Sequence, residues 1–189
     1  MKLSTVIAAS FGSAFALGAA LFVWRAENRD TDAPRHVEAQ ATSSSLLAAR
    51  FPDLDGRERA LGEWKGQVLV VNFWATWCAP CREEIPLFVA MEDKYGARGL
   101  QIVGLAIDRL DPVRAFAREL GVNYPLLIGG FEAVEIMRPL GNSAGALPFS
   151  VIYDRSGQAI LARLGAFHTD ELESRLRPLL GSQGREVVP

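Results

Sequence analysis

The two cysteines of this sequence stand three positions apart, in the run Cys78-Ala79-Pro80-Cys81. An apolar, strand-like segment ends just before them and a helix is expected to follow, which places Cys78 at a helix N-terminus. The unpaired N–H groups and partial positive charge at that end favour a thiolate over a thiol. A thiolate one helical turn from a second cysteine predicts thiol–disulfide exchange.

Two other uses of the cysteines fit the sequence less well. A structural zinc site needs four ligands, and the only further soft ligands are His36, in a low-complexity stretch, and His168, far along the chain. A purely structural disulfide that closes so short a loop would contribute only about 2 kcal/mol in the chain-entropy model. The sequence therefore predicts a redox-active Cys78–Cys81 disulfide, with no metal and no other cofactor.

The composition argues against a nucleic-acid partner. The 189 residues include 20 Lys and Arg and 22 Asp and Glu, which gives a formal net charge of −2. The basic residues are scattered among the acids, so no Lys/Arg block is available to neutralise phosphates. A chain of this length fits one globular domain with an extension.

The extension lies at the N-terminus. From Leu3 to Trp24 no residue is charged, and this span is long enough to cross a bilayer as a helix. No small-x-small cleavage site follows it, so residues 1–24 are predicted to be an uncleaved transmembrane anchor, with a cleaved signal sequence as the alternative. Residues 25–49 lack hydrophobic periodicity and are predicted to be a flexible linker. A lone redox pair behind an anchor fits an oxidising compartment outside the cytoplasm.

The remaining chain alternates strand and helix patterns. A turn signal at residues 53–56 predicts a short hairpin, and apolar runs at 68–74 and 101–107 predict strands buried in the centre of a sheet. This alternation predicts an α/β domain. The further elements expected are a helix from the cysteines to about Tyr95, kinked at Pro86; a helix capped by Asp111 that ends at Leu120; a strand at 124–128; a helix at 131–138; a hairpin of strands at 149–153 and 159–164; and a helix from Thr169 to Gly181.

Three motifs, taken in order, make the chain resemble thioredoxin-fold proteins, and more narrowly the membrane-anchored TlpA/ResA group of thiol:disulfide oxidoreductases. The specific motif runs from Val70 to Arg82 and holds the cysteines; the weaker ones are Gly104-Leu105-Ala106-Ile107-Asp108 and Leu147-Pro148. The resemblance implies a thioredoxin-like α/β fold over residues 50–181, with an N-terminal β-hairpin and a central strand–helix insertion between Asp111 and Gly141. Residues 182–189 would form a C-terminal tail.

The resemblance also implies roles for individual residues. Cys78 would be the attacking thiolate, with its sulfur exposed, and Cys81 would be the buried, resolving cysteine. Pro148 matches the cis-proline of the family, and the backbone beside it would pair with an extended substrate. Further substrate contacts are implied for Trp77, Ala79, Pro80 and Leu147.

Two positions depart from the thioredoxin pattern. Asn72 stands where thioredoxin has a buried aspartate, and an amide cannot take up a proton from Cys81. Two acids are candidates for handling that proton: Glu84, one turn into the helix, and Asp108, at the end of a strand. Leu147 replaces the threonine common before the cis-proline, which would narrow the substrate groove or make it more apolar.

The function implied by this resemblance is reduction of protein disulfides through a mixed disulfide on Cys78. Partners would be an apocytochrome c or another extracytoplasmic thiol protein, and a membrane thiol donor would supply electrons. The catalytic domain would face the periplasm from a single-pass anchor in the inner membrane. Three alternatives stay open: a disulfide oxidase or isomerase, a thiol peroxidase, and a module that binds Cu(I) through its thiolates.

Overall fold

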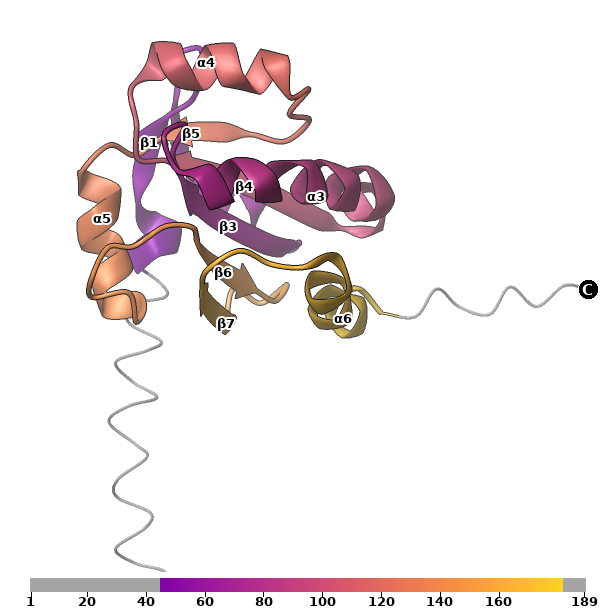
Figure 1. The fold of residues 1–189 in the computed structure, drawn as a ribbon. Coiled ribbons are helices and arrows are strands. Elements are labelled where there is room, and N and C mark those ends of the chain that lie inside the picture. The colour runs from indigo at the N-terminus through magenta and orange to yellow at the C-terminus, as the bar shows by residue number, and fades with distance from the viewer. Residues whose placement is uncertain (1–44, 182–189) are drawn as a thin grey trace, which may run out of the picture. The chain divides into compact units, whose positions relative to one another are not determined.

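The computed structural model describes residues 45–181, and its centre is a five-stranded sheet with the strand order β5-β4-β3-β6-β7. β3, β4 and β5 run parallel, whereas β6 pairs antiparallel with β3, and β7 pairs antiparallel with β6 (Figure 1). The sheet is therefore mixed. Its strands are β3 (Val68–Trp74), β4 (Leu100–Ala106), β5 (Leu126–Ile128), β6 (Phe149–Tyr153) and β7 (Ala159–Leu164).

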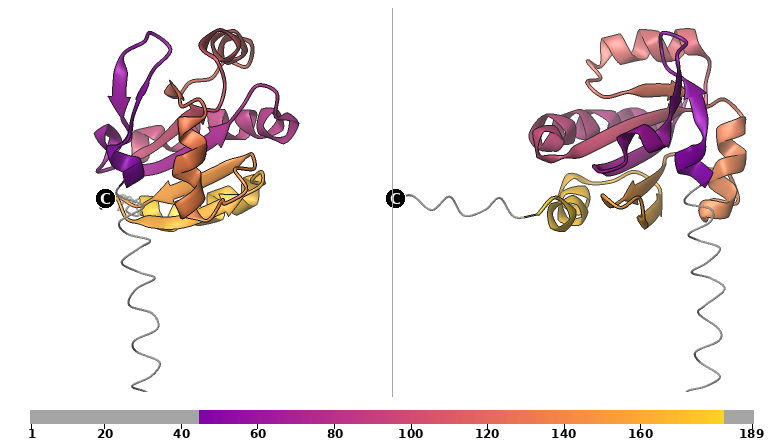
Figure 2. Two further views of the ribbon diagram at one scale, coloured as in Figure 1. Left: turned by 90° about the vertical axis from the view of Figure 1, so that its left-hand side faces the viewer. Right: turned by 180° about the vertical axis from the view of Figure 1, so that it is seen from behind.

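Helices cover both faces of this sheet, as the two further views in Figure 2 show. One face packs against α3 (Ala79–Tyr95), α4 (Leu110–Glu119) and α6 (Thr169–Leu180). The other face packs against α5 (Glu132–Met137), the short helix η1 (Leu61–Trp64) and the hairpin of β1 (Arg50–Pro52) and β2 (Glu58–Ala60). Two further 3-10 helices, η2 (Gly96–Arg98) and η3 (Arg138–Leu140), extend α3 and α5.

The central strand β3 is buried along its whole length. Its side chains alternate between the two cores: Val70 and Trp74 face the cluster formed by α3 and α6, while Val71 and Phe73 face the opposite cluster. This is the pattern of a strand covered on both faces, and it confirms the prediction for residues 68–74.

The order and type of the predicted elements are confirmed, including the N-terminal hairpin and the insertion of α4, β5 and α5 between β4 and β6. Some boundaries differ by one or two residues: β5, predicted from residue 124, begins at Leu126, and β4, predicted at 101–107, covers Leu100–Ala106. α4 begins at Leu110 with Arg109 at the N-cap, so the predicted cap Asp111 lies within the first turn. Proline is tolerated anywhere in the first turn of a helix, where backbone N–H groups have no partner within the helix. Pro112, which follows Asp111, therefore indicates the start of the helix only to within one turn. Pro86 lies inside α3, which is continuous from Ala79 to Tyr95.

The folded domain begins earlier than predicted. Residues 45–48 form a helical turn, and the Leu46 side chain is fully buried in the cluster that also holds Phe51 and Leu61. The Leu61 N–H group donates to the Ala49 carbonyl at 3.3 Å. The assignment of residues 45–49 to a flexible linker is therefore wrong, because a short apolar segment without periodicity can still fill a core once the hairpin is in place.

The predicted anchor at residues 1–24, the rest of the predicted linker and the predicted tail at 182–189 lie outside the described residues. Within residues 45–181, none of the helices is long and apolar enough to cross a membrane.

Replacing Leu46 by Ala should lower the free energy of unfolding by about 2–4 kcal/mol, because it leaves a cavity in a packed core. Denaturant unfolding of the purified protein measures this change. Leu164→Ala is the matched control: Leu164 is 54% exposed on β7, so its truncation should change stability by less than about 1 kcal/mol. Equal effects of the two substitutions would show that residues 45–48 are not part of the fold.

Candidate active site

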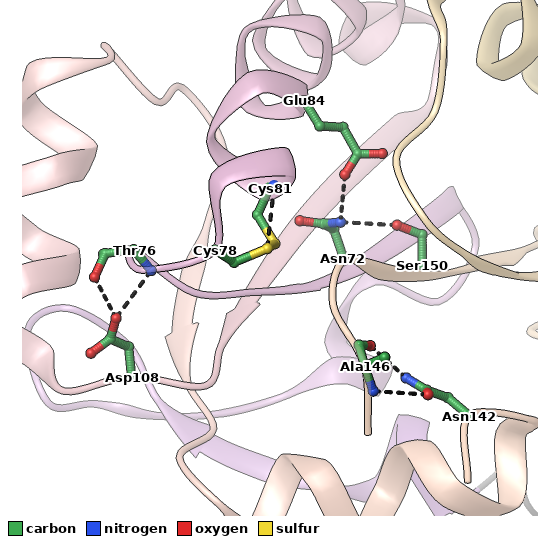
Figure 3. The surroundings of a disulfide bond; sticks show 9 residues. All are labelled: Asn72, Thr76, Cys78, Cys81, Glu84, Asp108, Asn142, Ala146 and Ser150. Atoms are coloured by element: carbon green, nitrogen blue, oxygen red, sulfur yellow. Dashed lines mark hydrogen bonds between the residues drawn. A yellow bond between two sulfur atoms is a disulfide. The ribbon is translucent and has the colours of Figure 1, made fainter. Parts of the chain in front are cut away.

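The two cysteines lie where the central strand passes into α3. β3 ends at Trp74, a three-residue turn follows, and Cys78 is the N-cap of α3. The cysteines form a disulfide with an S–S distance of 2.06 Å, and the Cys81 N–H group donates to the Sγ of Cys78 at 3.3 Å (Figure 3). A thiolate at Cys78 would keep this N–H group as a donor, in the positive end of the helix dipole.

The sulfurs are less accessible than the sequence indicated. Cys81 is 1% exposed, as expected of the second cysteine, but Cys78 is only 5% exposed although its sulfur was predicted to be open to substrate. The residues around it are open instead: Ala79 and Pro80 are exposed, and Trp77 is 69% exposed. A reaction partner therefore has to lie against these exposed neighbours to reach Cys78.

The predicted cis-proline is present. The Leu147–Pro148 peptide bond is cis, Pro148 is buried and Leu147 is half-buried. β6 follows immediately, and its first residue Phe149 pairs with Phe73 near the end of β3. Because β6 lies next to β3, this pairing places Pro148 at the same end of the sheet as the disulfide.

Asn142 holds the loop before the cis-proline, and sequence reasoning missed it. Its side chain is buried, donates to the Ala146 carbonyl at 2.8 Å and accepts from the Ala146 N–H group at 3.0 Å (Figure 3). These two bonds fix the backbone just ahead of Leu147. Asn in a loop usually signals a turn, and nothing local in the sequence shows that its side chain points inward.

A buried polar cluster lies behind the disulfide. The Asn72 amide on β3 donates to Ser150 Oγ at 2.9 Å and to the Glu84 carboxylate at 3.3 Å (Figure 3). The second carboxylate oxygen of Glu84 accepts the Phe167 N–H group at 2.6 Å. Glu84 is 3% exposed, so the candidate acid on α3 lies inside the protein, within the same cluster of groups as Asn72.

Burial raises the pKa of Glu84 to about 7, although the hydrogen bonds from Phe167 and Asn72 and the charge of Arg163 all act to lower it. Desolvation is the largest of these effects, because the carboxylate has lost nearly all contact with water. A carboxyl group with this pKa exchanges its proton near neutral pH.

Arg163 supports this cluster from β7, and sequence reasoning missed it too. Its guanidinium binds Glu171 at 2.6 Å, donates to the Ala166 carbonyl at 2.9 Å and stacks over the Phe167 ring. These contacts hold the loop whose Phe167 N–H group binds Glu84. An arginine in an alternating strand pattern is usually solvated, so its role depends on the loop that folds back onto it.

Asp108, the other candidate acid, has a structural role. It accepts hydrogen bonds from the Thr76 N–H and hydroxyl groups and from the Arg109 N–H group (Figure 3). Burial opposes its ionisation, yet these hydrogen bonds together lower the pKa of Asp108 below its usual value. Asp108 thus ties the turn before Trp77 to the end of β4, and it has the properties of a fixed acceptor rather than of a proton carrier.

Comparison with known proteins agrees with this site. Residues 37–177 match the model of the AhpC/TSA family. The chain belongs to this family. The thiol-disulfide oxidoreductase ResA of Bacillus thuringiensis (strain Al Hakam) is 31% identical over 128 residues, which cover 67% of this chain and 72% of the relative. ResA of Geobacillus thermodenitrificans (strain NG80-2) is 28% identical over 144 residues, which cover 75% and 79%.

The fold of this AhpC/TSA-family protein is also similar to that of a solved structure. It is a thiol:disulfide interchange protein of the thioredoxin family from Chlorobium tepidum TLS, with a TM-score of 0.65 and 27% identity over 72% of this chain and 95% of that one. The resemblance drawn from the motifs is therefore confirmed: the protein is a ResA-like thiol-disulfide oxidoreductase with a thioredoxin-like fold, and its Cys78–Cys81 pair forms the disulfide.

No group of three His, Cys, Asp or Glu side chains within residues 45–181 could hold a metal ion. The expectation that the protein needs no cofactor beyond its own disulfide stays a prediction.

Glu84→Gln should change how stability depends on pH. The folded protein holds the Glu84 proton up to a pKa of about 7, against 4.5 for an unperturbed glutamate, so stability falls as the pH rises through this interval. Relative to the variant, the oxidised wild-type protein should lose about 2 kcal/mol of unfolding free energy between about pH 5 and pH 8. Denaturant titrations at several pH values measure this difference.

Glu83→Gln is the control for that experiment, since Glu83 is the exposed neighbour on the same helix. It should keep the wild-type pH dependence. The disulfide sulfurs do not titrate in the oxidised protein, so they do not contribute to the difference. Parallel pH profiles of wild type and Glu84→Gln would mean that Glu84 is not protonated near neutrality.

Proposed function

We propose that this protein reduces disulfide bonds of other proteins outside the cytoplasm. The observation that supports this best is the position of Cys78 as N-cap of α3, with the Cys81 N–H group on its sulfur and the cis-proline loop beside it. The Cys78 thiolate attacks one substrate sulfur, and the other substrate sulfur leaves as a thiol. The Cys81 thiolate then attacks Cys78 Sγ, which releases the second substrate thiol and leaves the Cys78–Cys81 disulfide. The two cysteines supply both electrons.

We propose that Glu84 accepts the proton that the Cys81 thiol loses. Cys81 must lose a proton before it can attack, and at 1% exposure it cannot readily pass that proton to water. Cys81 and Glu84 are three residues apart on α3 and both are buried, so they share one face of the helix. The raised pKa of Glu84, about 7, suits a group that accepts this proton and returns it near neutral pH. Asn72, which binds Glu84, orients the carboxylate.

The substrate-binding surface is assigned to exposed residues around the buried sulfur. Ala79 and Pro80 form the exposed first turn of α3, and Trp77 offers an apolar face. The backbone of Leu147, before the cis-proline, would pair with an extended substrate, as in the family that the sequence resembles.

The proposed location is the inner membrane, with the catalytic domain in the periplasm. It is supported by the uncharged span from Leu3 to Trp24 and by the need of a disulfide reductase for a compartment where disulfides persist. A membrane thiol donor would then return electrons to the disulfide. An apocytochrome c, or another extracytoplasmic thiol protein, is the proposed substrate.

Replacing Cys81 by Ser should trap substrates as mixed disulfides on Cys78, because the resolving thiol is gone. Cys78→Ser should trap none, since Cys81 is buried and cannot reach a protein disulfide. Non-reducing gel electrophoresis after incubation with a disulfide-containing protein measures the trapped species. Trapping by both variants, or by neither, would contradict the assigned roles.

The reduction potential should lie nearer that of thioredoxin, about −270 mV, than that of DsbA, about −120 mV. Ala79 and Pro80, between the cysteines, supply neither a cation nor a histidine to stabilise the thiolate, so the reduced form gains little. Equilibration against glutathione or dithiothreitol measures the potential. A value above about −180 mV would favour a disulfide oxidase or isomerase instead.

A further inference from the structure

A groove of about 240 Å³ lies beside the disulfide, on the side of β4 and β5. Its walls come from residues that follow the carboxyl ends of the three parallel strands β3, β4 and β5, which meet at the end of the sheet where α3 begins (Figure 1). The crevice outside the carboxyl ends of parallel strands is where open α/β sheets usually bind ligands. The lining residues are Trp77, Ile107, Asp108, Arg109, Gly130 and Phe131.

Two aromatic side chains make this groove unlike the rest of the surface. Phe131 is 89% exposed and Trp77 is 69% exposed, which makes them the two most exposed large apolar side chains of the described residues. Rigid aromatic side chains of this kind contribute much of the binding energy at protein interfaces. Two polar residues also line the groove: the Asp108 carboxylate already accepts from Thr76 and from the Arg109 N–H group, and Arg109 is exposed to solvent. The groove therefore offers apolar contact.

The groove lies across β3 from the cis-proline. β6, which follows Pro148, neighbours β3 on one side, and β4, which precedes Asp108 and Arg109, neighbours it on the other. Cys78 lies between them, at the end of β3. An extended segment that pairs with the Leu147 backbone and passes over Cys78 therefore continues towards Trp77 and Phe131.

Disulfide geometry requires the substrate to lie close to this groove. In a mixed disulfide the Cα atoms of the two cysteines are about 6 Å apart, and an extended chain advances about 3.3 Å per residue. Trp77 is adjacent to Cys78 in the chain and lines the groove, so residues within about three positions of the substrate cysteine come within reach of it. A polypeptide that forms the mixed disulfide therefore lies within reach of this surface.

We propose that the groove between Trp77 and Phe131 binds a bulky apolar side chain of the substrate polypeptide, within a few residues of its reactive cysteine, and that Phe131 determines this specificity. The proposal rests on the reduction of protein disulfides proposed above. The occupant is a segment of a protein substrate, because the groove is continuous with the surface around Cys78 that the substrate must cover.

The test uses the reduced full-length protein and peptides whose single cysteine carries 5-thio-2-nitrobenzoate as a mixed disulfide. One Phe is placed in turn at each of the three positions on either side of the cysteine, and the reference peptide has Ser at all of them. Each turnover oxidises the dithiol to the disulfide and releases the peptide thiol and coloured thionitrobenzoate. The symmetric disulfide of thionitrobenzoate serves as the small substrate without a peptide.

Wild type should prefer at least one Phe peptide over the Ser peptide. Phe131→Ala should lower the second-order rate constant of this single-turnover oxidation about tenfold for that peptide, mainly by raising the peptide concentration at half-saturation, as expected when an aromatic contact at an interface is removed. Its rates with the Ser peptide and the small disulfide should stay within about twofold of wild type, and Phe131→Leu should restore much of the preference. Ile160→Ala removes another exposed apolar side chain, 48% exposed on β7, and should change none of these values.

An equal loss on all three substrates, or no preference of wild type among the peptides, would overturn the proposal while leaving the reductase function in place. Self-association of wild type that Phe131→Ala abolishes would assign the groove to a second copy of the chain and would also overturn it. Failure of wild type to reduce even the small disulfide would instead contradict the proposed function, on which this inference rests.

Discussion

The site depends on the burial of β3 in the centre of the sheet. This strand is hydrogen-bonded to β4 on one edge and to β6 on the other, and helices cover both of its faces. Its end therefore cannot move relative to its neighbours. Because only three residues separate the end of β3 from Cys78, the N-cap of α3, the reactive sulfur takes its position from the most constrained strand of the domain. The cis-proline just before β6 and the groove beyond β4 are placed relative to that sulfur by the same pairing.

The polar cluster behind the disulfide opposes stability and has the properties that the proposed proton transfer needs. Asn72, Glu84, Ser150 and the Phe167 N–H group come from four separate segments and bind one another inside an apolar core. Burying a carboxylate is costly even when it is hydrogen-bonded, and burial accordingly dominates the pKa of Glu84. A carboxyl group whose pKa lies near neutral pH can take up and release a proton in a place that water does not reach. Arg163 limits the cost by holding the loop that supplies one of the hydrogen bonds.

The two cysteines are buried, but several of their neighbours are exposed to solvent. Because the cysteines are buried, a reaction partner must contact the residues around them. Trp77, Ala79 and Pro80 are exposed and can make that contact. The surrounding surface can therefore select the substrate, while the N-terminus of α3 makes the Cys78 sulfur reactive. Phe131 belongs to this surrounding surface, although it follows β5 rather than β3.

The sequence by itself determined the chemistry and the order of the elements, because both depend on spacing between near neighbours. Cys78 and Cys81 one helical turn apart, the apolar run of β3 and the Leu147–Pro148 pair are local signals. The tertiary structure alone decided which acid became buried: packing of α3 on β3 encloses Glu84, and the turn to Thr76 engages Asp108. It also decided that the segment from residue 45 joins the core and that Phe131 and Trp77 line one groove. These contacts join residues tens of positions apart, and their geometry follows from strand pairing, which no short stretch of sequence encodes.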